Sequence, residues 1–149
     1  MLNNAAQSVG PSFDAEQLVN QPLLNPTLLA HVDASQALAA GLAVRIQSND
    51  NAYVAVLTNS GQAQIWFFNG ASNSFTVLAS TNAGSNSGTL AFTVTGGATP
   101  TLLLYLNGGL SPLLSDTPGG SNTILYAGGV GIFSWGPGGR VDNLTVSGS

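Results

Sequence analysis

Carboxyl groups are the first candidates for chemistry in this sequence. Six acidic residues occur in 149 positions, and only Asp14 and Glu16 stand two residues apart. A retaining glycosidase needs two carboxyl groups about 5 Å apart, one acting as the nucleophile and one as the acid. The single glutamate, Glu16, lies before the first regular strand pattern. The sequence therefore argues against glycoside hydrolysis.

Other catalytic groupings find no better support. His31 is the only histidine, so it would have to be the base of any Ser-His-Asp site. Asp33 falls on the same side of the expected strand, and a locally hydrogen-bonded strand histidine is the simpler interpretation. There is no Gly-x-Ser-x-Gly motif and no glycine-rich loop that leads into a helix. The sequence predicts a protein that is not an enzyme.

Calcium binding is the metal chemistry that the composition leaves open. Calcium prefers carboxylate and carbonyl oxygens, and many sandwich proteins bind it at a loop rim. The candidate ligands are Asp50 with Asn51, Asp116, and Asp142. The alternatives are that Asp50 and Asp116 are turn residues and that Asp142 pairs with Arg140 on one strand face. No cofactor is certain from the sequence.

Aromatic and amide side chains suggest a ligand of a different kind. Sugars stack on exposed aromatic rings while amides and carboxylates bond their hydroxyl groups. A ligand site is predicted on a loop rim or sheet face that bears Trp135, Asp50 and Asn51, with Trp66 and Asn69 as further candidates. The alternatives are that Trp66 belongs to the core and that Trp135 plugs the edge of the fold.

The charge content limits the classes of partner that the protein is expected to bind. Charged residues make up 5% of the chain, there is no lysine, and the net charge is −4, whereas a typical soluble domain is about 25% charged. Without a basic patch, binding to nucleic acid is not expected. No apolar run reaches the roughly 18 residues needed to cross a bilayer, so membrane insertion is not expected either.

The hydrophobic pattern is that of short antiparallel strands. In residues 41–69, apolar positions alternate with polar ones and are interrupted by the turn clusters 48–51 and 59–61. Similar runs follow about every ten residues, with glycine-rich turns between them and almost no helical period. This predicts an all-β, antiparallel jelly-roll sandwich of about ten or more short strands. Its expected core is Leu42, Val44, Ile46, Leu90, Phe92, Val94, Leu102, Leu104, Leu106, Val130 and Ile132.

The chain reads as one β-sandwich domain over residues 1–149. Residues 1–26 are the least regular part, because Pro11, Pro22 and Pro26 interrupt any long element. Residues 27–147 carry the strand pattern. The sequence shows no signal peptide at its start, so an exported protein would carry that signal elsewhere.

Three ordered segments resemble one known family. Residues 41–57 (GLAVRIQSNDNAYVAVL) resemble the central hairpin of laminin-G-like, concanavalin A-like jelly rolls. Residues 102–110 (LLLYLNGGL) resemble a later hairpin of that family, and residues 129–147 (GVGIFSWGPGGRVDNLTVS) resemble its closing pair. The resemblance implies two packed antiparallel sheets and a non-catalytic module that binds glycans or mediates adhesion on a cell surface or outside the cell.

Two functions are consistent with these observations. The first is a glycan-binding or adhesion module of a secreted or cell-surface protein. The second is a structural subunit of an extracellular filament, shell or array, because scarce charge favours association. An outward apolar row at Leu103 and Tyr105 predicts self-association or cover by a neighbouring domain.

Overall fold

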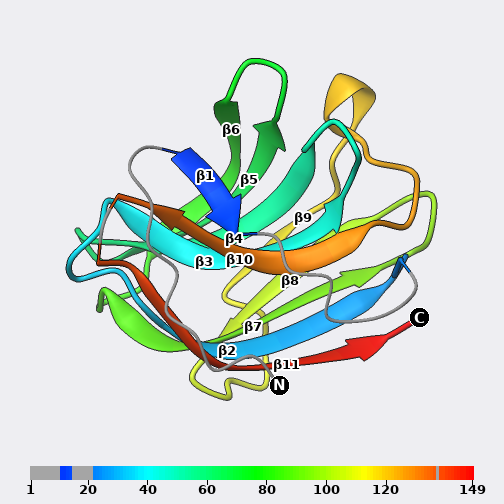
Figure 1. Cartoon of the computed structure of the whole chain (residues 1–149). Helices are drawn as coiled ribbons and strands as arrows, with labels where there is room; N and C mark the ends of the chain where they lie inside the picture. The colour runs from blue at the N-terminus through cyan, green and yellow to red at the C-terminus, as the bar shows by residue number, and fades with distance from the viewer. Residues whose placement is uncertain (1–10, 15–21, 137) are drawn as a thin grey trace.

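Eleven β-strands and one short 3-10 helix make up the computed structural model, which describes residues 11–14, 22–136 and 138–149 (Figure 1). The strands are β1 (Pro11–Asp14), β2 (Pro26–Asp33), β3 (Ala39–Ile46), β4 (Ala52–Thr58), β5 (Gln62–Asn69), β6 (Ser74–Asn82), β7 (Ser87–Thr95), β8 (Thr101–Leu106), β9 (Leu114–Asp116), β10 (Gly129–Trp135) and β11 (Arg140–Gly148), and the helix is η1 (Gly120–Asn122). Among the described residues no helix is long and apolar enough to cross a membrane. The predicted all-β class is confirmed.

The strands form two antiparallel sheets packed face to face. One sheet has six strands in the order β1-β10-β3-β4-β5-β6, and the other has five in the order β11-β2-β7-β8-β9. Figure 1 shows the two layers one above the other, with β3 and β10 over β2 and β7. The predicted meander is confirmed as β3–β4–β5, because the turn clusters recognised in the sequence lie between these strands.

Alternation along the strands builds the core. Leu28, Leu90, Phe92 and Leu104 are fully buried between the sheets and face the buried side of β3 and β4. Of the predicted core residues, Ile46 and Leu106 are only partly buried. The others are confirmed as buried: Leu42, Val44, Leu90, Phe92, Val94, Leu102, Leu104, Val130 and Ile132.

Two strand assignments from the sequence need correction. The apolar residues of 110–114 (LSPLL) predict a strand there, but this segment is mostly a turn, and strand β9 starts at its last residue, Leu114. Within the segment predicted as irregular, β1 (Pro11–Asp14) pairs with β10 at the edge of the six-stranded sheet. Proline 11 is tolerated there because an edge strand needs only half of its backbone groups for pairing.

A third correction concerns the side chain of Arg45. Strict alternation places Arg45 on the outward side of β3, yet its side chain is completely buried. Gly129 pairs with Ile46 and Gly131 pairs with Ala43, so β3 carries one extra residue opposite β10. Arg45 sits in this bulge with φ of 49°. A β-bulge bends the strand and redirects its side chains, which also explains why Ile46 leaves the core.

Candidate functional site

Arg45 fastens three separate segments at one end of the sandwich. Its Nε donates to the Leu24 carbonyl oxygen at 2.7 Å, and its Nη1 donates to that of Ile124 at 2.6 Å. Its Nη2 donates to the Gly97 carbonyl oxygen at 2.6 Å and to Asn25 Oδ1 at 3.5 Å. A buried cation needs such partners, because removal from water is otherwise very costly. Burial lowers the pKa of Arg45.

Tyr53 and Gln47 hold the segment that follows η1. The hydroxyl of Tyr53 donates to the Asn122 carbonyl oxygen at 2.9 Å and accepts the N–H of Ile124 at 2.7 Å. Gln47 Nε2 donates to the carbonyl oxygens of Tyr126 and Ala127, both at 3.2 Å. Residues 122–127 are thereby positioned by side chains of β4 and of the turn after β3, although they have no strand partner of their own in the described structure.

The β3–β4 turn is fixed by its own amides. The Gln47 N–H donates to the Asn51 carbonyl oxygen, and Asn49 Oδ1 accepts the Asn51 N–H at 3.0 Å. Asp50 has φ of 66°, a conformation that Asp and Asn tolerate better than other side chains. Asn51 Oδ1 also accepts the Gly70 N–H at 2.9 Å, which ties this turn to the β5–β6 turn. A Cβ at Gly70 would lie 2.0 Å from the Asn49 carbonyl oxygen, so only glycine fits here.

A pocket of about 290 Å³ opens between this turn and the segment after η1. The two segments lie side by side at the right of Figure 1. The pocket is lined by Gln47, Ser48, Asn49, Asn51, Thr123, Ile124, Leu125 and Tyr126. Tyr126 is 71% exposed and Leu125 is 45% exposed. An exposed aromatic ring beside several amides is an arrangement that can stack a sugar ring and bond its hydroxyls.

Of the residues that line this pocket, the sequence interpretation named only Asn51, and it missed the exposed aromatic side chain of Tyr126. Residues 124–126 form a short apolar run in the sequence, and in the described structure side chains rather than a neighbouring strand hold this run. The glycine pair Gly128-Gly129 directly after Ala127 is the signal that marks this run as a loop with an aromatic side chain.

The residues predicted to share one ligand site do not come together. Trp135 pairs with Ala39 at the start of β3, whereas Asp50 and Asn51 follow the end of β3. The length of β3 places them at opposite ends of the sheet, roughly 20 Å or more apart. Asn51 lines the pocket described above, and Asp50 is exposed in the same turn.

The two tryptophans meet on the outer face of the six-stranded sheet. The Trp66 ring stacks on Phe75 with centroids 3.9 Å apart and meets the edge of Trp135 at 6.2 Å. The Trp66 indole N–H donates to Gln64 Oε1 at 2.8 Å. Trp66 is 2% exposed, so its rings are used in packing, while Trp135 and Phe75 are half-buried at the rim of the cluster. Asn69 instead stabilises the next turn, where its Oδ1 accepts the Ala71 N–H.

The candidate calcium ligands remain separate. Asp142 lies 4.0 Å from Arg140 Nε, which confirms the predicted pairing. Burial raises the pKa of Asp116 on β9. Among the described residues, no three histidine, cysteine or acidic side chains form a group that could hold a metal ion. Asp50, Asp116 and Asp142 are therefore not brought into one such group in the described structure.

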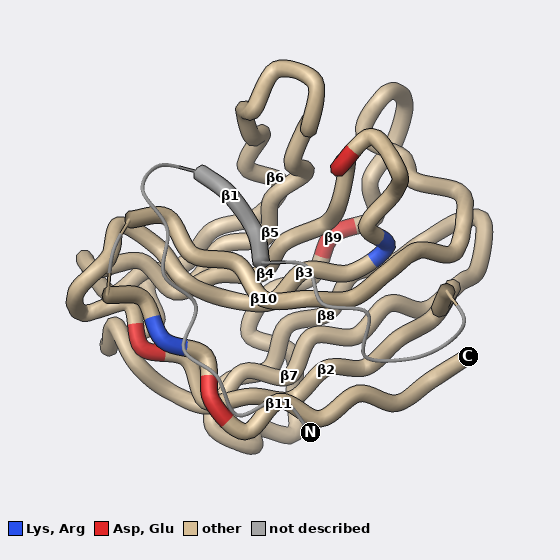
Figure 2. The backbone as a smooth tube through the Cα atoms, in the orientation of Figure 1, with Lys and Arg blue, Asp and Glu red and all other residues tan. Residues whose placement is uncertain are grey.

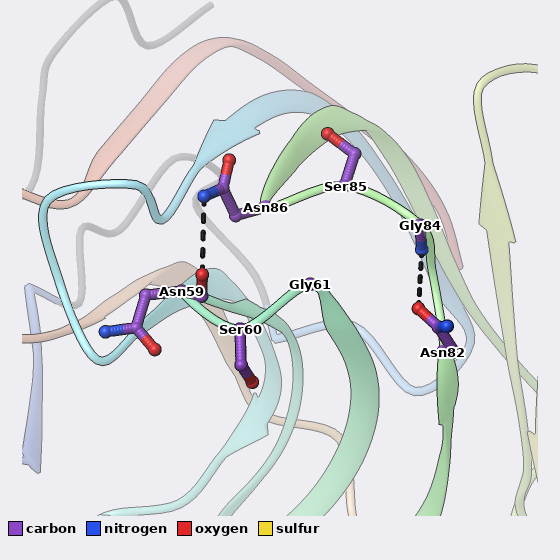
Figure 3. Close-up of a pocket in the computed structure, with 7 residues that line it drawn as sticks. All are labelled: Asn59, Ser60, Gly61, Asn82, Gly84, Ser85 and Asn86. Atoms are coloured by element: carbon purple, nitrogen blue, oxygen red, sulfur yellow. Dashed lines mark hydrogen bonds between the residues drawn. The ribbon is translucent and has the colours of Figure 1, made fainter.

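A second and larger pocket lies near the opposite end of the six-stranded sheet (Figure 3). It measures about 440 Å³ and is lined by Asn59, Ser60, Gly61, Asn82, Gly84, Ser85 and Asn86. Asn86 Nδ2 donates to the Asn59 carbonyl oxygen at 3.3 Å, and Asn82 Oδ1 accepts the Gly84 N–H at 2.9 Å. The sticks in Figure 3 point in different directions rather than toward one centre. None of the described residues that line this pocket is aromatic or charged.

Comparisons with known proteins identify the fold. No family model and no curated protein sequence matches the chain. The sialidase CBM40 of Ruminococcus gnavus, bound to α2,3-sialyllactose, is similar in structure with a TM-score of 0.58 and 15% identity, over 97% of this chain and 90% of that one. Chicken galectin 2 has a TM-score of 0.54 and 11% identity, over 93% and 100%. A pentraxin of Limulus polyphemus has a TM-score of 0.50 and 15% identity, over 91% and 74%. The chain therefore has the jelly-roll, concanavalin A-like fold shared by these proteins.

Proposed function

We propose that this chain is a non-catalytic glycan-binding module. The observation that supports this function is the pocket between the β3–β4 turn and residues 123–126, in which the exposed Tyr126 ring stands beside Asn49 and Asn51. Arg45 and Tyr53 hold the wall at Ile124 through buried hydrogen bonds, and the turn that forms the other wall is held by its own amides. A preformed pocket loses little conformational freedom when a ligand binds.

The charges around the pocket favour a neutral sugar. The chain has two cationic side chains. Arg45 is completely buried and bonded to carbonyl oxygens, and Arg140 belongs to the other sheet, where it pairs with Asp142. Asp50, by contrast, is exposed in the turn. A sialoside carries a carboxylate, and the described residues that line the pocket include no cation to bind it, while the neighbouring Asp50 would repel it. We therefore propose neutral hexoses rather than sialosides.

The laminin-G-like resemblance of residues 41–57, 102–110 and 129–147 leads us to propose that the module belongs to a secreted or cell-surface protein. Adhesion through glycans is the biological role that this placement suggests. We propose calcium-independent binding, because the described acidic side chains form no cluster.

A glycan array that contains neutral and sialylated glycans, probed with and without EDTA, tests this function. We expect neutral glycans to bind equally in both conditions and Tyr126→Ala to remove the signal, with thermal stability unchanged because Tyr126 is mostly exposed. Tyr105→Ala, on the half-buried outer side of β8, is the matched tyrosine control and should retain binding.

Trp135→Ala separates the proposed pocket from the tryptophan cluster. Loss of binding in Trp135→Ala at unchanged stability, together with full binding by Tyr126→Ala, would move the site to the outer face of the six-stranded sheet. Absence of any bound glycan would contradict the function itself.

A further inference from the structure

The sequence contains one sequon for N-linked glycosylation. Of the 14 asparagines, only Asn143 is followed two positions later by threonine or serine with a residue other than proline between them, as Asn143-Leu144-Thr145. Asn25 also precedes a threonine by two positions, but Pro26 between them excludes it. A motif of three residues can occur by chance, so the surroundings of Asn143 in the structure carry the argument.

Asn143 lies in a bulge of the edge strand β11. Asp142 pairs with His31 and Thr145 pairs with Leu29, so β11 has two residues where β2 has one. The backbone of Asn143 has φ of 58°, a left-handed conformation that asparagine tolerates better than most side chains. The bulge takes Asn143 out of the alternation of the strand, and its side chain is exposed.

The Asn143 side chain makes no hydrogen bond that the fold depends on. In Asn49, Asn69, Asn82 and Asn107, by contrast, the Oδ1 atom accepts a backbone N–H group and stabilises a turn. No residue within the described part of the chain forms a hydrogen bond with the Asn143 amide. A glycan attached to this amide would therefore break no side-chain hydrogen bond of the described structure.

The position of Asn143 leaves room for a bulky group. Strand β11 is the outermost strand of the five-stranded sheet, and no described strand pairs with its outer side. Thr145, the other residue that the sequon needs, is exposed on the same strand. Figure 2 shows charge at one end of β11, and the strand is uncharged from Asn143 onward. Charge does not protect this stretch of the sheet edge, whereas a hydrophilic glycan would cover it.

We propose that Asn143 carries an N-linked glycan. This inference rests on the secreted or cell-surface placement proposed above, because the sequon is used in exported proteins. The amide nitrogen of Asn143 forms a bond to the anomeric carbon of an oligosaccharide donor and loses a proton, and the polyprenyl pyrophosphate of the donor leaves. The glycan covers the outer edge of β11 and adds hydrophilic surface to a chain with only 5% charged residues.

Two substitutions at Thr145 form a matched pair that tests the site. The whole chain is expressed in eukaryotic cells behind a cleavable secretion signal, so that it meets the glycosylation machinery. Thr145→Val removes the hydroxyl group that the sequon requires, and Thr145→Ser keeps it. Both substitutions fall at an exposed position of β11, so both variants should fold like the wild type.

The wild type and Thr145→Ser should exceed 15.0 kDa by the mass of one oligosaccharide that peptide N-glycosidase releases, and Thr145→Val should have the unmodified mass. Peptide mass spectrometry after release should find the amide of Asn143 converted to a carboxylate. An unmodified wild type overturns the proposal, and so does a glycan that persists in Thr145→Val. The mass does not depend on ligand binding, so a glycan array without bound glycan would contradict the proposed function and leave this inference unaffected.

Discussion

The two ends of the six-stranded sheet differ in how they are held. At the end of β3, Arg45 and Tyr53 reach from buried positions to carbonyl and N–H groups of three distant segments. At the other end, loops 59–61 and 83–86 are held by turn bonds, such as Thr58 Oγ1 to the Gln62 N–H and Asn82 Oδ1 to the Gly84 N–H. Buried side chains connect distant segments at the first end, whereas the second end is connected by bonds within each turn and between the two neighbouring loops.

The way in which each end is held is a better guide to the candidate ligand site than the volume of its pocket. The larger pocket is lined by turn residues that bond one another, whereas the smaller one combines an exposed aromatic ring with amides on a fixed base. Preorganised polar groups beside an aromatic ring provide both orientation and affinity. We therefore regard the smaller pocket, which lies beside the buried side chains of Arg45 and Tyr53, as the better candidate site.

Removing the Arg45 anchor should have the largest effect. Arg45→Met leaves the carbonyl oxygens of Leu24, Gly97 and Ile124 without their buried donor, and we expect a loss of about 3–5 kcal/mol of unfolding free energy. Urea denaturation measures this loss. Arg140→Met is the matched control, and its exposed pair with Asp142 should be worth less than about 1 kcal/mol. Equal losses for the two variants would show that Arg45 stabilises the fold no more than an exposed surface arginine does.

Removing the Tyr53 hydroxyl should have an intermediate effect. Tyr53→Phe leaves the ring in the core but deprives the Ile124 N–H and the Asn122 carbonyl oxygen of their partner. We expect about 1–3 kcal/mol of destabilisation. Hydrogen exchange should show faster exchange at residues 122–127 than at 83–86, relative to the wild type. A uniform change along the chain would mean that Tyr53 does not anchor this segment.

Asp116 should have the smallest effect, and its sign depends on pH. Burial raises the pKa of Asp116 above its ordinary value, so the ionised form is less stable in the folded protein than in the unfolded chain. Asp116→Asn should therefore raise the thermal midpoint at pH 7, and the gain should fade as the pH drops through the raised folded pKa to the ordinary pKa of the unfolded chain. Thermal scans between pH 3 and pH 7 measure this. A lower midpoint at neutral pH would show that Asp116 is stabilised by its surroundings.

Much of the fold could be predicted from the sequence because it depends on local patterns. The alternation in residues 41–69 and the Asn-Gly and Gly-Gly turns specify strands and hairpins without knowledge of distant contacts. Arg45 was misplaced because its bulge depends on the register of β10, nearly ninety positions away in the chain. Alternation within one strand contains no information about such a partner.

The candidate site could be predicted only in part, for the same reason. Asn51 and Asp50 are recognisable turn residues, but their neighbour Tyr126 is brought to them by hydrogen bonds from Gln47 and Tyr53. Trp135, which the sequence places with them, lies at the far end of β10. Contacts between segments far apart in the chain decide which aromatic ring lies beside which amide. A pattern within a short stretch of sequence does not predict such contacts.

We propose that a ligand binds at the end of the six-stranded sheet that Arg45 and Tyr53 anchor. Titration of the ¹⁵N-labelled chain with a neutral glycan selected on the array, followed by amide chemical shifts, tests this most directly. The account predicts shifts concentrated at residues 47–51 and 123–126, with none at 59–61 and 82–86. Shifts centred on 59–61 and 82–86, or on the strands around Trp66 and Trp135, would contradict it.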